Sequence, residues 1–281
     1  MPMTEIDLRR LAAALKTMRL RSGKSTASLA QDLGWSQSMV SRIENGRRHA
    51  RVAEAAAWAD ATNADDRARA ELLALAEAVG AAVEVRSWWD LHARGLARRQ
   101  HEIAELEGEA GRIRNCQPVV PGLLQTADYA HKILTLSNVT GQRDLGGALT
   151  ARLARQAVLQ DTAKRFDYVL PESALRWRPS ADPTVMRAQG DRLLAVSQLP
   201  NVDLAILPFS VVIPIVPLTG FVLYEIPGEP IVLLETVTDE VIFGAEREIT
   251  AYREAFAKMR AAAVAGAEAR ALIHDVMITA R

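Results

Sequence analysis

Residues 25–48 read S-T-A-S-L-A-Q-D-L-G-W-S-Q-S-M-V-S-R-I-E-N-G-R-R. Two short segments with helical spacing of their apolar residues lie on either side of Gly34, and the second segment ends at Gly46. Ser25 and Ser36 are suited to cap the two helices, because a serine hydroxyl accepts a hydrogen bond from a free N–H of the first turn. The stretch therefore predicts a helix-turn-helix, a unit that places its second helix in the major groove of DNA.

The second helix offers polar side chains on the face opposite its apolar residues, Val40 and Ile43. Such side chains can read base edges: Gln pairs with adenine, Arg with guanine and Ser with either. The residues expected to contact bases are Ser36, Gln37, Ser38, Ser41 and Arg42. Arg47, Arg48 and Arg51 follow the helix and are expected to contact phosphates, which position a protein without reading sequence.

The charge distribution also favours double-stranded DNA as a partner. The whole chain is neutral, with 34 basic and 34 acidic residues. Residues 1–51 contain 10 Lys/Arg and 4 Asp/Glu, a net charge of +6, so the other 230 residues carry −6. The basic segment, which also contains the motif, is the part of the chain that a phosphate backbone would attract.

Residues 8–62 resemble the DNA-binding domain of Xre/Cro-type repressors, with an ungapped match from Arg19 through G-K-S-T-A-S-L-A to S-R-I-E-N-G. The resemblance implies a partly buried structural ion pair between Arg19 and Glu44. The family often has a phosphate-binding glutamine where this chain has Thr26, so that contact is weakened or taken over by the hydroxyl. Two other interpretations remain: a helical hairpin inside a larger core, or a module of this kind used only for protein contacts.

The chain's 281 residues are enough for two domains. We expect an all-α domain over residues 1–80 and an α+β domain with a small sheet over residues 81–281. The 49% apolar content is typical of globular proteins. No apolar run reaches 18 residues and the N-terminus has no signal-peptide core, so we expect no membrane association. Cys116 is the only cysteine, which rules out an intrachain disulfide and fits a reducing cytoplasm.

The expected elements of the second domain follow from hydrophobic periodicity and turn residues. Helices are expected over residues 92–115, 123–134, 149–161, 183–199, 245–263 and 268–278. Strands are expected over residues 167–170, 202–207, 221–226, 231–235 and 241–243, with Pro227-Gly228 as a hairpin turn. Two further helices, over residues 52–62 and 65–79, are expected to complete the first domain. Trp88-Trp89 is either a binding platform or a packing hinge between the domains, and we favour the hinge.

The second domain also resembles a known family. H-E-I-A-E-L-E-G-E-A-G-R-I-R-N-C-Q-P-V-V-P-G-L-L-Q-T-A-D-Y-A, residues 101–130, is similar to the regulatory domain of actinobacterial, antitoxin-like Xre-type transcriptional regulators. Later pieces such as L-P-E-S-A-L-R and G-F-V-L-Y-E-I agree. The resemblance implies a cytoplasmic regulator that is often encoded next to a small partner protein, and it implies no catalytic residues.

No motif predicts an enzyme. His101 begins H-E-I-A-E, which lacks the second histidine of the zinc-peptidase motif H-E-x-x-H. The sequence contains no G-x-S-x-G, no Walker loop and no G-x-G-x-x-G, and Cys116 has no local signature of a nucleophile. We therefore expect no catalysis, no cofactor and no metal site.

Two hypotheses of different classes remain. The chain is either a sequence-specific regulator, homodimeric on a palindromic operator and modulated through its second domain, or an antitoxin-like protein that binds a small partner and uses DNA binding for autoregulation. The candidate partner or ligand residues are Gln125, Tyr129, Arg152, Arg155 and Gln156, although ordinary packing would also explain them. An enclosed apolar pocket beside the sheet would favour small-molecule sensing, with an effector that the sequence does not identify.

Overall fold

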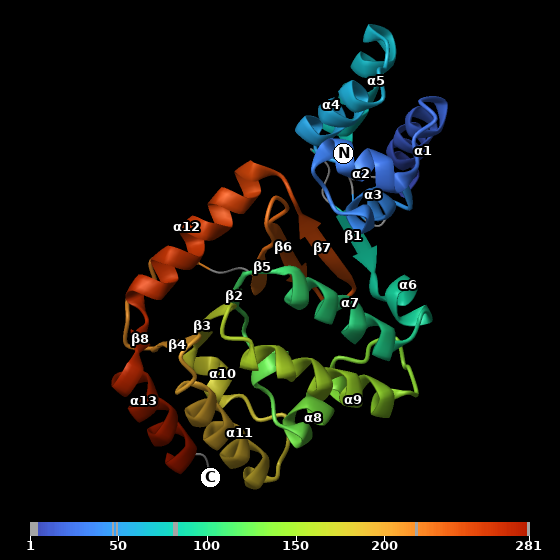
Figure 1. Ribbon diagram of the computed structural model, residues 1–281. Helices are drawn as coiled ribbons and strands as arrows, with labels where there is room; N and C mark the ends of the chain where they lie inside the picture. Colours follow the sequence, from blue (N-terminus) through green and yellow to red (C-terminus); the bar gives the residue numbers. More distant parts are fainter. Residues whose placement is uncertain (1–4, 47, 49, 81–83, 217–218, 280–281) are drawn as a thin grey trace. The chain divides into compact units, whose positions relative to one another are not determined.

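The computed structural model describes residues 5–46, 48, 50–80, 84–216 and 219–279 (Figure 1). The chain divides into two compact units, Met1–Val85 and Arg86–Arg281. The boundary lies five residues beyond the one expected from the sequence.

The first unit is helical. Its helices are α1 (Glu5–Arg21), α2 (Thr26–Leu33), α3 (Gln37–Glu44), α4 (Val52–Ala61) and α5 (Asp66–Gly80). Their core contains Leu15, Leu29, Val40 and Trp58, each fully buried. The indole Nε1 of Trp58 donates to the carbonyl oxygen of Leu15 at 3.1 Å, which satisfies the polar atom of the largest core side chain.

The turn between α2 and α3 has the local structure that the sequence predicts. Ser25 caps α2 by accepting from the Ser28 N–H, and Ser36 caps α3 by accepting from the Met39 N–H. Gly34 has φ +68°, a left-handed conformation that glycine adopts at little cost. These local bonds satisfy backbone groups that a helix end otherwise leaves open.

The second unit contains a mixed sheet, so the expected α+β class is confirmed. Within the described residues the sheet has eight strands in the order β1-β7-β6-β5-β2-β3-β4-β8. The strands are β1 (Glu84–Ser87), β2 (Arg112–Cys116), β3 (Arg165–Pro171), β4 (Val202–Leu207), β5 (Phe221–Glu225), β6 (Ile231–Glu235), β7 (Asp239–Phe243) and β8 (Val264–Ala265). β3 pairs in parallel with β2 and β4, whereas β5, β6 and β7 form an antiparallel meander.

Helices cover both faces of this sheet. They are α6 (Trp88–Ala93), α7 (Leu96–Glu109), α8 (Ala127–Leu136), α9 (Leu145–Arg155), α10 (Glu172–Arg176), α11 (Pro183–Val196), α12 (Glu246–Ala262) and α13 (Gly266–Thr279), with 3-10 turns η1 (Gly122–Leu124) and η2 (Gln156–Gln160). Along β3, Tyr168 belongs to the core shared with α8, α11 and α13, whereas Val169 belongs to the core under α12. This alternation follows from the two-residue period of a strand.

The helix expected over residues 92–115 is wrong at both ends. Gly95 has φ +98°, outside the helical region, and separates α6 from α7. α7 ends at Glu109, and Arg112–Cys116 forms β2 instead, between β3 and β5. Ile113 and Cys116 are buried by these neighbours, so tertiary pairing overrides the helical tendency of the preceding charged segment.

Candidate DNA-binding surface and the cavity of the second unit

The N-terminal turn of α3 carries the exposed polar side chains of the first unit's motif. Ser36, Gln37 and Ser38 are exposed, whereas Ser41 and Arg42 are half-buried. Ser36 has a structural role already, because its hydroxyl accepts from the Met39 N–H at 3.2 Å. Gln37 and Ser38 are therefore the exposed residues of the five that do not cap α3.

Gln37 and Thr26 form a hydrogen bond at the start of the two motif helices. The amide nitrogen of Gln37 donates to Thr26 Oγ1 at 3.2 Å. The bond restricts the Gln37 side chain, which lowers the entropy lost when its amide is ordered against a base. Thr26 therefore lies beside Gln37, which is predicted to read a base. Thr26 occupies the position at which the Xre/Cro-type family often has a phosphate-binding glutamine.

The expected ion pair between Arg19 and Glu44 is present. Arg19 Nη2 donates to Glu44 Oε2 at 2.9 Å, and Arg19 Nε donates to the other carboxylate oxygen. Arg19 Nη1 also donates to the Lys24 carbonyl oxygen at 2.7 Å. The pair connects the end of α1 to the end of α3 and has side chains only 9% and 5% exposed, so it fixes the orientation of α3.

The structure corrects one predicted phosphate contact. Arg48 is buried, and its Nη2 donates to Glu54 Oε1 at 2.7 Å, so this guanidinium is committed to the fold rather than presented to a backbone. Glu54 also accepts from the Arg51 backbone N–H at 2.9 Å, which caps α4. The Arg51 side chain is half-buried, and Arg47, which was also expected to contact phosphate, lies outside the described residues.

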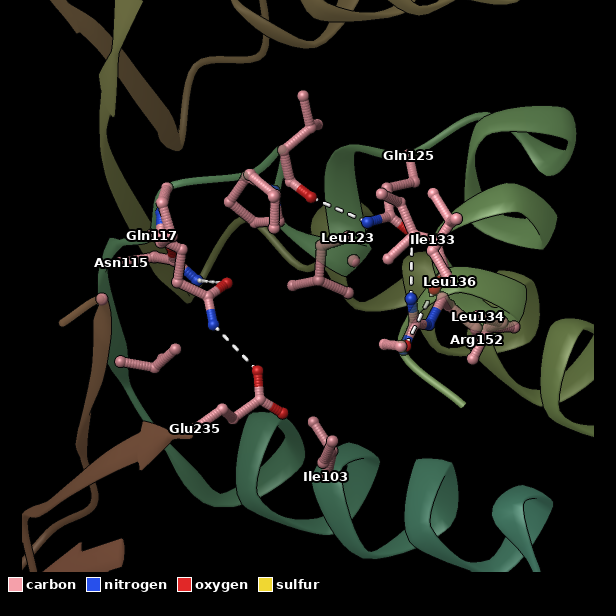
Figure 2. A pocket seen from close by; sticks show the side chains of 18 of the residues that line it. Ile103, Asn115, Gln117, Leu123, Gln125, Ile133, Leu134, Leu136, Arg152 and Glu235 are labelled. Carbon is pink, nitrogen blue, oxygen red and sulfur yellow. Dashed lines mark hydrogen bonds between the residues drawn. The ribbon is translucent and has the colours of Figure 1, made fainter. Parts of the chain in front are cut away.

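The second unit contains a cavity of about 1250 Å³ bounded by α7, α8, α9, η1 and the β2, β5 and β6 strands. Most of its lining is apolar, and it includes Ile103, Leu123, Leu134 and Val222. Figure 2 shows Leu123 and Ile103 between two separate polar groups, one around Gln125 and Arg152 and one around Asn115, Gln117 and Glu235. The cavity is larger than a typical small-molecule pocket of about 300–1,000 Å³.

Four of the five predicted ligand residues line this cavity: Gln125, Tyr129, Arg152 and Arg155. Gln156 is not among the lining residues. Its amide nitrogen instead donates to the carbonyl oxygens of Gly122 and Gln125, at 3.0 and 2.8 Å, and so holds η1 in place.

Arg155 forms a buried ion pair in the cavity wall. Its Nη1 donates to Glu107 Oε1 at 2.7 Å, and the two side chains are 7% and 5% exposed. Burial raises the pKa of the Glu107 carboxyl to about 7, although Arg155 and Arg152 act in the opposite direction. A second buried pair joins Arg99 to Glu240.

Arg152 differs from these arginines because its hydrogen-bond partners are neutral. Its Nε donates to Gln100 Oε1 at 3.2 Å and its Nη1 donates to Gln125 Oε1 at 3.1 Å. Gln125 is held in turn, since its amide nitrogen donates to the Val120 carbonyl oxygen at 2.7 Å. Burial, followed by the neighbouring charge of Arg155, lowers the pKa of Arg152 to about 10, so it remains charged at neutral pH.

Sequence reasoning missed the contribution of α7 to the cavity. Leu96, Gln100, Ile103 and Glu107 recur at intervals of four, three and four residues, and all four are buried cavity residues. A helical stripe of this spacing normally faces a core. The signal available in the sequence was therefore the pair of polar residues, Gln100 and Glu107, on an otherwise apolar stripe.

His101, Cys116 and the Trp88-Trp89 pair, which the sequence also singled out, form no catalytic or metal site among the described residues. His101 is exposed on α7, and within the described ranges no three His, Cys, Asp or Glu side chains are grouped to hold a metal ion. Cys116 is buried with its Sγ 3.6 Å from Met259 Sδ, and burial raises the pKa of its thiol to about 12. Trp88 donates to the Thr236 carbonyl oxygen at 3.0 Å and lines the cavity, whereas Trp89 is 54% exposed.

The comparisons with known proteins agree with this division. Residues 10–72 match a family model described as a helix-turn-helix domain, which supports a DNA-binding regulator. Residues 100–275 match a model described as a domain of unknown function, DUF5753. This match covers more than half of the chain, and the protein belongs to that family.

The other two comparisons were with curated proteins and with solved structures. No curated protein matches the chain. One similar solved structure is titled "Structure of TrmBL2, an archaeal chromatin protein, shows a novel mode of DNA binding", with 14% sequence identity and a TM-score of 0.33. The alignment covers 73% of this chain and 63% of that one. Among the described residues, no helix has the length and apolar character needed to cross a membrane.

Proposed function

We propose that the protein is a sequence-specific DNA-binding transcriptional regulator of the Xre type, without catalytic activity of its own. The observation that supports this most directly is the N-terminal turn of α3, where Gln37 and Ser38 are exposed on a helix fixed by the Arg19–Glu44 pair. Glutamine and serine read base edges in the major groove, and the N-terminal residues of a recognition helix make such contacts.

The proposed regulator acts as a homodimer on a palindromic operator. One helix-turn-helix contacts only a few base pairs, whereas two copies related by a twofold axis double the contacts. Their recognition helices would then lie roughly 34 Å apart, one turn of DNA. We assign dimerisation to the larger second unit. Sedimentation of a fragment covering residues 86–281 tests this assignment, and a fragment that is only monomeric would contradict it.

The deciding experiment is selection of bound DNA from a random pool with the wild-type protein and with a Gln37→Ala/Arg42→Ala variant. A palindromic motif that the variant loses supports base reading by α3, and the half-site spacing tests the dimer. Each residue that makes a bidentate base contact should contribute about 1–3 kcal/mol, confined to particular base pairs. The absence of any selected motif would overturn sequence-specific binding.

We assign modulation of DNA binding to the second unit. The proposed regulator acts in the cytoplasm. Its cavity of about 1250 Å³, with mainly apolar walls and a few polar groups, supports an effector of small-molecule size. This observation favours the sensing regulator over the antitoxin-like alternative.

An exposed apolar loop supports the antitoxin-like protein as a second candidate function. Between β4 and β5, Phe209, Val212, Ile213 and Val216 are 65%, 89%, 50% and 64% exposed. Exposed apolar groups gathered on one loop are typical of a protein-binding surface. The test is co-expression with the product of a small reading frame adjacent to the gene: a stable complex that Val212→Asp dissociates would support this candidate, and separate elution of the two wild-type proteins would refute it.

A further inference from the structure

The walls of the cavity suit an extended apolar molecule. Ile103, Leu123, Leu134 and Leu233 are all buried in the protein and line the same space. Their side chains come from α7, η1, α8 and β6, so the apolar surface surrounds the cavity instead of forming one flat wall. Burial of apolar ligand surface against such walls supplies affinity without directional contacts.

The charge balance of the cavity is uneven. Arg99, Arg155 and Arg176 each have a carboxylate partner, respectively Glu240, Glu107 and Glu172. Within the described part of the chain, no carboxylate oxygen lies within ion-pairing distance of Arg152, whose side chain bonds only to amide oxygens. This half-buried guanidinium is hydrogen-bonded to neutral groups alone, and the Glu235 and Glu107 carboxylates act on it only through space.

Arg152 is also oriented for a further contact. A guanidinium has five N–H donors, and Arg152 uses one on Nε and one on Nη1. No hydrogen bond from its Nη2 forms within the described residues, and the residue lines the cavity. Gln100 and Gln125 hold the guanidinium through its Nε and Nη1 atoms, so its position is set before any ligand arrives.

The opposite end of the cavity offers acceptors. Asn115 Oδ1 is buried and has no hydrogen-bond partner within the described residues, while Asn115 Nδ2 donates to Gln117. Glu235 lies beside them and accepts from the Gln117 amide at 3.2 Å. Figure 2 shows this group separated from Arg152 and Gln125 by the apolar side chains of Leu123 and Ile103. A ligand that reaches both ends therefore needs an acceptor at one end and a donor at the other.

We propose that the cavity binds an elongated, mainly apolar monocarboxylate, with its carboxylate on Arg152 and a hydroxyl or N–H group directed to Asn115. The ligand's carboxylate supplies the directly bonded counter-charge that Arg152 lacks, through charge-assisted hydrogen bonds. As the effector of a transcriptional regulator this ligand rests on the proposed function, but its binding to the cavity can be measured without DNA.

The test uses two fluorescent probes that differ by one anionic group. Anilinonaphthalene sulfonate is apolar with one sulfonate, which stands in for the carboxylate, and N-phenyl-1-naphthylamine has the same rings without it. The wild-type full chain should bind one equivalent of each, and decanoate should displace the sulfonate probe better than decanol. Arg152→Gln should weaken the sulfonate probe about ten- to a hundredfold and leave the neutral probe unchanged.

Three variants make the result interpretable. Arg98→Gln removes a charge from the outer side of α7, where the side chain is 63% exposed, and should change neither probe. Arg152→Lys keeps the charge and should retain part of the sulfonate affinity even if Arg152→Gln folds poorly. Leu134→Trp fills the cavity and should weaken both probes.

The outcomes separate the inference from the proposed function. Equal binding of the sulfonate probe by wild type and Arg152→Gln, or no saturable binding of either probe by wild type, would overturn the carboxylate site. A chain that binds the probes as expected but selects no DNA motif would refute the proposed function alone. Selection of a DNA motif by a chain that binds no probe would refute the cavity inference alone.

Discussion

Replacing Arg19 with methionine should remove a large fraction of the stability of the first unit. The substitution leaves the Glu44 carboxylate, 5% exposed, without its bidentate partner, and it removes the donor to the Lys24 carbonyl oxygen. Breaking a buried pair in this way costs about 3–5 kcal/mol. A domain of this size is stable by roughly 4–12 kcal/mol, so the loss is a large fraction of the total.

Hydrogen–deuterium exchange measured peptide by peptide separates the two units in the full chain. In Arg19→Met, peptides from α1 to α4 should exchange with an opening free energy lowered by about 3–5 kcal/mol, while peptides from β3 should stay protected. The matched control is Arg19→Met/Glu44→Leu, which removes both charges and should recover most of the loss.

Two results would refute this reasoning. A loss of less than about 1 kcal/mol in Arg19→Met would mean that the pair behaves like a solvent-screened surface pair. A double variant as unstable as the single variant would mean that Arg19 acts through packing of its aliphatic portion rather than through Glu44.

Three further predictions concern single side chains. Arg51→Ala should weaken binding to all DNA sequences alike and reduce the slope of log K against log salt concentration by about 0.9. Arg48→Ala should mainly lower the free energy of unfolding, because it removes the ion pair with Glu54. Salt titrations of DNA binding and urea unfolding measure the two effects, and their reversal would contradict the assignment of Arg51 to phosphate and Arg48 to the fold. Cys116 should resist iodoacetamide in the folded chain and react after denaturation, because burial raises its pKa to about 12; rapid labelling of the native protein would contradict its burial. The Glu107 carboxyl has a pKa of about 7 in the folded state against an ordinary value of 4.5, so the folded domain binds a proton that the unfolded chain releases, and this contribution to stability is lost as pH rises from about 4.5 through 7. Thermal unfolding of Glu107→Gln between pH 5 and 8 should therefore show a shallower fall with pH, and an unchanged slope would assign the dependence to other groups.

The elements defined by local signals were predicted closely. Ser25, Ser36 and Gly34 specify the motif turn through bonds and backbone angles within a few residues of each other. The hairpin at Pro227-Gly228 joins antiparallel β5 and β6, and Gly228 has φ +74°. Such features depend on short-range geometry, which a sequence displays directly.

The central strand β2 could not be predicted in the same way. R-I-R-N-C follows a charged helical segment, and its strand conformation depends on partners far along the chain, Arg165–Pro171 on one side and Phe221–Glu225 on the other. Among the site residues, Gln125 was expected on the helix that follows Pro121 and Arg152 on the next helix, whereas the structure places Gln125 between η1 and α8. Their mutual bond at 3.1 Å joins residues 27 positions apart.

The helix-turn-helix, the basic character of its segment, the Arg19–Glu44 pair and most elements of the second unit could thus be predicted from the sequence. These follow from hydrophobic periodicity, caps and turn residues, and from a pattern shared with a known family. Two features depend instead on tertiary packing: Arg48 is buried against Glu54, and Arg152 lines a large, mainly apolar cavity with no carboxylate of the described residues within ion-pairing distance. Burial and charge pairing are sums over distant segments, so the environment of a side chain is fixed only when those segments pack together.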